Sequence, residues 1–109
     1  MFDELVADLR SINGVMIQEY EFKTRPSSNH GTVQIDFEVS EDTGDDAKQD
    51  RAFEGSLDLF TYGKEMMIVA AVETVLETHC SGSWYLNSEQ YEHETGIIHR
   101  EFVFQIEKR

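Results

Sequence analysis

Two stretches of the sequence carry apolar residues at the spacing of a helix. In residues 2–12 these are Phe2, Leu5, Val6, Leu9 and Ile12. Asn13-Gly14 follows, a pair that tolerates the left-handed conformation in which helices often end. In residues 64–79 they are Ile68, Ala71, Val72, Val75 and Leu76, with Met66, Met67, Val69 and Ala70 widening the stripe. A second helix that is apolar on more than one side is expected to be covered by something else, such as another subunit.

The segments between these helices alternate as strands do. Residues 15–22 are rich in β-branched and aromatic residues, and residues 24–31 read as a loop with the only proline. From Thr32 to Ser40, Val33, Ile35, Phe37 and Val39 are predicted to share one face, with Thr32, Gln34, Asp36, Glu38 and Ser40 opposite. The next strand is expected to place Phe53, Gly55, Leu57 and Leu59 opposite Glu54, Ser56 and Asp58.

The C-terminal third predicts a hairpin. Strands over residues 84–94 and 97–107 meet at Thr95-Gly96, which favours a two-residue turn. That turn would pair His93 with Ile98, Glu92 with His99 and Tyr91 with Arg100. Ile98, Phe102, Phe104 and Ile106 would then share the face that meets the core.

The order of these elements predicts one α+β domain over residues 1–109. The order α-β-β-β-α-β-β favours a mainly antiparallel sheet with both helices packed on one side. A single cysteine, Cys80, excludes an intramolecular disulfide, and no charged-then-apolar leader opens the chain, so a reducing, cytosolic setting is expected. No apolar run approaches the ~20 residues that span a bilayer, so we expect a soluble protein without membrane partners.

Charge narrows the range of partners. The net charge of −13 repels DNA, RNA and anionic lipid. Nine acidic and two basic residues lie between residues 36 and 58. Residues 41–50 (EDTGDDAKQD) contain no apolar residue except Ala47, so we expect a mobile acidic loop that cannot bury enough surface to become ordered.

Three groups of residues suggest chemistry, and none fits a known catalytic or metal-binding pattern. His79-Cys80 places a thiol beside an imidazole, but adjacent side chains rarely face each other and no third residue is visibly placed to orient the base. Glu92, His93, Glu94 and His99 are competent metal ligands, yet only Glu92 and His99 are predicted neighbours. The acids from Asp42 to Asp50 lack calcium-loop spacing. We therefore predict no enzyme activity, no metal and no cofactor.

Two long segments resemble a known family. The run FEGSLDLFTYGKEMMIVAAVETVL followed by WYLNSEQYEHETGIIHREFVFQIE is similar to tail terminator proteins of long-tailed bacteriophages and their prophage remnants. The resemblance covers nearly the whole chain in element order, without a diagnostic short motif. It implies a structural virion protein that forms a ring, usually hexameric, on the tail tube and joins it to the head. Tail tube and head–tail connector proteins would be its partners, in the host cytoplasm during assembly and then in the virion.

In a ring through which DNA passes, an acidic lining would keep the DNA from sticking, because carboxylates repel phosphate. We hypothesise that Asp36, Glu38, Asp42, Asp45 and Asp46 face the channel of such a ring. Two alternatives stay open. An acidic protein of this size could imitate DNA to inhibit a nucleic-acid-binding protein, or an α+β pocket lined by Trp84, Tyr85, Phe102 and Phe104 could bind a small molecule.

Overall fold

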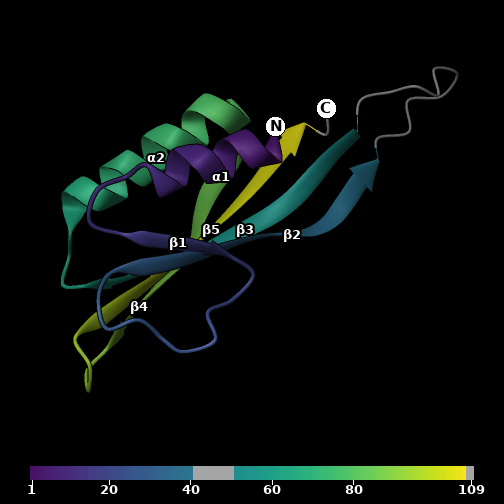
Figure 1. Ribbon diagram of the computed structural model, residues 1–109. Helices are drawn as coiled ribbons and strands as arrows, with labels where there is room; N and C mark the ends of the chain where they lie inside the picture. The colour runs from purple at the N-terminus through teal and green to yellow at the C-terminus, as the bar shows by residue number, and fades with distance from the viewer. Residues whose placement is uncertain (41–50, 108–109) are drawn as a thin grey trace, which may run out of the picture.

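Two helices lie side by side on one face of a five-stranded sheet (Figure 1). The computed structural model describes residues 1–40 and 51–107. The elements are α1 (Phe2–Arg10), β1 (Met16–Glu19), β2 (His30–Ser40), β3 (Arg51–Tyr62), α2 (Met66–Cys80), β4 (Trp84–Glu92) and β5 (Ile97–Glu107). The predicted α+β class, the order of elements and the placement of both helices on one side are confirmed. The acidic segment at residues 41–50, with Asp42, Asp45 and Asp46, lies outside the described residues.

The sheet has the strand order β1-β2-β3-β5-β4 and is mixed. All neighbouring pairs are antiparallel except β1 and β2, which run parallel, so the expected mainly antiparallel character is matched only in part. Tyr20, which has a φ of 71°, ends β1 after only four residues. Because β1 is so short, the ten residues that follow are enough to return the chain to the start of β2 in the parallel direction.

The core fills the space between the helices and the sheet. Its fully buried side chains include Leu5 and Leu9 of α1, Val72 and Leu76 of α2, and Phe102 of β5. The four helix residues belong to the apolar stripes that the helical spacing predicted, and burying each side chain of this size contributes roughly 1.5–3 kcal/mol. Gly14, with a φ of 88°, turns the chain from α1 into β1, as the Asn-Gly signal predicted.

A β-bulge in β2 changes which residues share a face. Ile35 pairs with Gly55 and Phe37 pairs with Glu54, so Asp36 is the extra residue. Directly paired residues of antiparallel strands point to the same side. Phe37 therefore shares the face of Glu54, opposite the helices, and Glu38 shares the helix side with its partner Phe53. The prediction that Phe37 lies with Val33 and Ile35, and Glu38 with Asp36, was wrong from the bulge onward.

The C-terminal hairpin has a longer turn than Thr95-Gly96 predicted. Strand pairing ends at Glu92 with Ile97, which leaves the four residues 93–96 in the turn. Tyr91 therefore pairs with Ile98 and Gln90 with His99, two residues away from the predicted register. A further bulge at Asn87 separates Leu86, opposite Phe102, from Ser88, opposite Glu101.

Candidate interaction surfaces

The sheet face away from the helices is uncovered over much of its area, and we call it the open face. Strand pairing arranges its side chains in rows that cross the sheet. One row is Phe37, Glu54 and Gln105; the next is Ser56, Val103 and Tyr85; the third is Asp58, Glu101 and Ser88. Two aromatic side chains stand exposed on it, Phe37 at 53% and Tyr85 at 56%.

The carboxylates of the open face are hydrogen-bonded mainly to neutral groups. The Asp36 carboxylate accepts from Gln34 at 2.6 Å, that of Glu54 from Gln105 at 3.4 Å and that of Glu101 from Asn87 at 2.9 Å. The fourth, Asp58, contacts the His99 ring at 2.8 Å. None of these four carboxylates is paired with a lysine or arginine in the part of the chain that the structure describes.

A ladder of aromatic rings closes one end of the open face. The rings of His30, Phe60 and His99 stack across three strands, with centroids 4.9 and 4.3 Å apart. Phe22 meets His30 edge to face, and the guanidinium carbon of Arg25 lies 5.4 Å from the centre of Phe60. Because Phe22 and Arg25 belong to the loop between β1 and β2, the ladder anchors that loop against the sheet.

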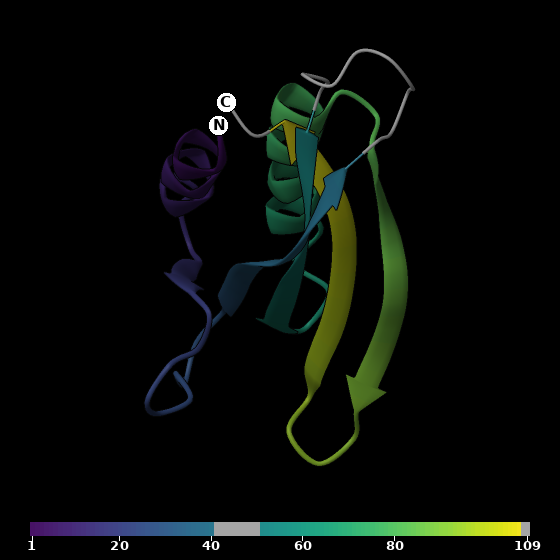
Figure 2. The ribbon, with the colours of Figure 1, turned by 90° about the vertical axis from the view of Figure 1, so that its right-hand side faces the viewer.

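The helix side of the sheet is also incompletely covered. The β4–β5 hairpin extends well beyond the helices (Figure 2). There a hollow of about 700 Å³ lies beside the first turn of α2, lined by Gly63, Lys64, Met66, Glu89, Tyr91, Ile98 and Arg100. Met66 is 58% exposed and the adjacent Met67 is 88% exposed. We call this hollow, together with Met67, the apolar hollow.

Arg100 forms the polar wall of the apolar hollow although its residue is only 3% exposed. Its Nε donates to Glu89 at 2.7 Å and its Nη1 donates to the Thr61 hydroxyl at 3.1 Å. A buried guanidinium is tolerated only when it is paired and hydrogen-bonded, and both conditions are met. Sequence reasoning missed Arg100, whose only signal was its place between Ile98 and Phe102 on the core-facing side of β5.

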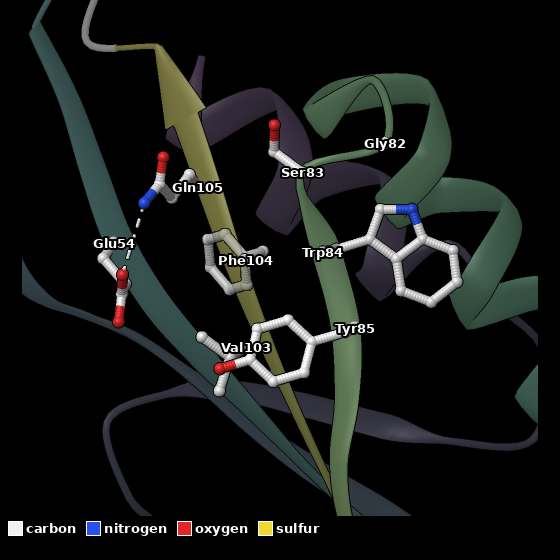
Figure 3. A pocket seen from close by; sticks show the side chains of 8 residues that line it. All are labelled: Glu54, Gly82, Ser83, Trp84, Tyr85, Val103, Phe104 and Gln105. Carbon is white, nitrogen blue, oxygen red and sulfur yellow. Dashed lines mark hydrogen bonds between the residues drawn. The ribbon is translucent and has the colours of Figure 1, made fainter.

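A shallow pocket of about 290 Å³ opens near the start of β4 (Figure 3). Glu54, Tyr85, Val103 and Gln105 line it, with Gly82, Ser83, Trp84 and Phe104. Figure 3 shows Tyr85 reaching over β5 toward Val103, while Trp84 points away toward α2, where its indole nitrogen donates to Glu77 at 2.8 Å.

Of the four aromatics considered for a small-molecule site, Trp84, Tyr85 and Phe104 contribute to the lining of this pocket and Phe102 does not. Phe102 and Phe104 are buried in the core, and Trp84 and Tyr85 lie on opposite sides of β4. A deep binding site needs polar groups that converge in an apolar cavity, whereas this pocket is shallow and its Glu54 and Gln105 side chains bond each other.

His79 and Cys80 do not form a nucleophile–base pair. The Nε2 atom of His79 lies 2.6 Å from the Asp8 carboxylate, which links α2 to α1. Sequence reasoning missed this carboxylate, which comes from 71 residues away. Burial, with a smaller effect of the Glu77 carboxylate, raises the pKa of the Cys80 thiol from 9.0 to about 11. A thiol held protonated is a poor nucleophile.

The residues weighed as metal ligands are separated by the observed register. His99 lies in the aromatic ladder against Asp58, and Glu92 pairs with Arg25 at 3.6 Å. His93 and Glu94 lie in the hairpin turn. Across residues 1–40 and 51–107, no three histidine, cysteine or acidic side chains are grouped so that they could hold a metal ion.

The two described residues of the hypothesised channel surface separate in the structure. Asp36 lies at the bulge beside the open face, hydrogen-bonded to Gln34, whereas Glu38 belongs to the helix side. Both are exposed. A channel surface formed by the side of β2 that faces away from the helices would therefore include Asp36 but not Glu38.

The sequence matches no protein-family model, and no curated protein matches it significantly. The described helices include none that is long and apolar enough to cross a membrane.

Proposed function

We propose that this protein is a structural assembly protein of a phage or prophage, which caps the tail tube as a homo-oligomeric ring and joins the tail to the head. The observation that supports this proposal best is the apolar hollow. Met66 and Tyr91 both line it and expose apolar surface, Met67 is exposed next to Met66 in α2, and apolar surface of this kind marks contacts with other proteins.

A ring requires two different surfaces on each subunit, because its contacts run head to tail. The apolar hollow is suited to be one of them. It contains Lys64 and Arg100, two of only nine basic residues in a chain with a net charge of −13. Contact between copies at this place therefore brings together less negative charge than contact at the open face.

The tail tube and the head–tail connector are the partners that this proposal implies. The ring is expected to be a hexamer, in the host cytoplasm during assembly and in the virion afterwards.

The experiment is a test of self-association by sedimentation velocity, with electron microscopy of the larger species. The double variant Met66→Glu/Met67→Glu places two charges in the apolar hollow and is expected to lower the association constant at least tenfold. Met16→Glu, at a methionine that is 51% exposed on β1, is the control and is expected to associate as the unaltered protein does.

Two results would contradict the proposal. One is a protein that stays monomeric at every concentration and ionic strength. The other is a ring whose stability is the same in the double variant, which would place the subunit contact elsewhere.

A further inference from the structure

The open face carries exposed aromatic side chains and carboxylates that the packing of the subunit itself does not explain. Its rows place Phe37, Glu54 and Gln105 side by side, next to Ser56, Val103 and Tyr85. Neither α1 nor α2 covers these rows, since both lie on the other side of the sheet (Figure 1). Antiparallel sheets often leave one face to water, but such a face normally carries polar side chains.

Exposed aromatic side chains on this face indicate that it binds something. The bulge at Asp36 turns Phe37 outward, and Tyr85 reaches across β5 to cover Val103 (Figure 3). Between Tyr85 and Glu54 lies the pocket of about 290 Å³, whose size suits one long side chain. Large aromatic residues with a polar end are enriched in protein interfaces because they bury much area with little loss of rotamer freedom.

The charges of the open face identify the kind of partner. Asp36, Glu54 and Glu101 are hydrogen-bonded to side-chain amides, which orient a carboxylate without neutralising it. None of these three carboxylates forms an ion pair with a lysine or arginine in the described part of the chain, so each is available to a cation that approaches. A second copy of the chain would instead bring like charges together and is disfavoured.

We propose that the open face is a docking surface for a partner protein that presents arginine or lysine next to apolar side chains. One basic side chain enters the pocket, where it pairs with the Glu54 carboxylate and lies against the Tyr85 ring. Apolar groups of the partner cover Phe37 and Val103. The pairing gains from a charge-assisted hydrogen bond and from the attraction between a cation and an aromatic face.

A bare DNA channel wall is a poorer match for the same surface. Exposed aromatic rings give nucleic acid bases a platform for stacking, which would hold a passing strand. The docking proposal does not rest on ring formation, because it concerns a different surface from the apolar hollow.

The test is a titration of the ¹⁵N-labelled full chain followed by NMR. The probe is a dodecapeptide of arginine, leucine and glycine, and the matched probe replaces each arginine with citrulline, which has a similar shape but no charge. The arginine peptide is expected to bind at least tenfold more tightly. It should shift the amide signals of Glu54, Tyr85, Val103 and Gln105 most strongly.

Variants show whether the arginine peptide binds the open face or is only attracted to the acidic protein as a whole. Glu54→Gln/Tyr85→Leu is expected to weaken binding of the arginine peptide at least tenfold. Glu4→Gln/Tyr20→Leu makes the same changes at exposed residues outside the three rows and is expected to leave binding within twofold. If Glu54→Gln/Tyr85→Leu does not fold, the single variant Glu54→Gln is compared with the control instead.

Three outcomes would overturn the proposal. Equal binding of the two peptides would remove the need for a cation. Signal shifts spread evenly over the acidic residues of α1 and the sheet, or an equal loss in the control variant, would show unspecific attraction. A 12-nucleotide single strand that shifts the same open-face signals would assign the surface to nucleic acid. Failure of ring formation in sedimentation would leave the result of the titration unaffected.

Discussion

At the scale of single residues, Gly55 shows how closely β2, β3 and β5 are packed. A Cβ atom at this position would lie 2.6 Å from Cζ of Phe104 and would also meet the backbone oxygen of Gln34. Neither neighbour can move easily, since Phe104 is 1% exposed and the Gln34 oxygen belongs to the sheet backbone. The absence of a side chain at Gly55 therefore leaves the space in the core that the Phe104 ring occupies.

We expect Gly55→Ala to lower the free energy of unfolding by about 1–3 kcal/mol, the usual cost of forcing an extra carbon into a packed core. Urea denaturation followed by fluorescence measures the change. Ser56→Ala, one residue along β3 and facing the other side, is the control, because it adds no carbon atom, and it is expected to cost less than Gly55→Ala does. Equal costs for the two variants would contradict this account of the packing.

The sequence predicted the packing residues better than the functional ones. Leu57, Leu59, Phe102 and Phe104 lie in the core where their alternation placed them. Arg100 could not be recognised as buried, because its guanidinium is stabilised by Glu89 and Thr61. These partners lie 11 and 39 residues away, and spacing along one strand carries no information about them.

At the scale of elements, the loop between β1 and β2 is ordered by contacts from three strands. Its residues Phe22 and Arg25 meet His30 and Phe60, and Arg25 also pairs with Glu92 of β4. The backbone oxygen of Pro26 accepts a hydrogen bond from the Tyr62 hydroxyl at 3.3 Å. The loop thus depends on side chains of the sheet more than on its own backbone hydrogen bonds.

Phe60→Ala is expected to loosen this loop, because it removes the contact with Arg25 and the ring that supports His30, against which Phe22 packs. A cation–aromatic contact contributes about 0.5–1 kcal/mol and an aromatic pair about 0.5–1.5 kcal/mol, so local opening should increase about tenfold. The rate of tryptic cleavage after Lys23 reports that opening. Tyr91→Ala removes an exposed ring that contacts only His93 among the aromatics, and it should leave the rate unchanged. The expectation fails if both variants are cleaved at the rate of the unaltered protein.

Some features of the strands were predicted wrongly because they depend on contacts between residues that are far apart in the sequence. The apolar alternation of β2 continues through Phe37 and Val39, so nothing in it reveals the extra residue at Asp36. That bulge exists because β2 and β3 pair in two registers. Thr95-Gly96 likewise signalled a turn but not its length, since residues 93–96 all belong to it. The parallel pairing of β1 depends on where a ten-residue loop returns.

At the scale of the whole molecule, charge and shape act together. The protein measures 54 × 26 × 24 Å and carries a net charge of −13. Copies that meet at the apolar hollow must overcome repulsion between their remaining surfaces. Salt screens this repulsion, with a Debye length of about 10 Å at 0.1 M and about 3 Å at 1 M.

Self-association is therefore expected to increase with ionic strength. Sedimentation velocity at fixed protein concentration in 50, 150 and 500 mM NaCl should show a growing fraction of the larger species. Binding of the arginine peptide to the open face should change in the opposite direction, because salt weakens attraction between unlike charges. Association that decreases as salt is added would show that ion pairs, not apolar contact, hold the copies together.

The bulge in β2 also has an evolutionary consequence. Side chains of a strand alternate between its faces, so loss of the one extra residue would return Phe37 and Val39 to the helix side and bring Glu38 outward. A single-codon deletion would thus exchange an aromatic surface for a charged one while leaving every other residue identical. Among relatives of this chain, a gap of one position at Asp36 would mark a change of binding partner more clearly than several substitutions would.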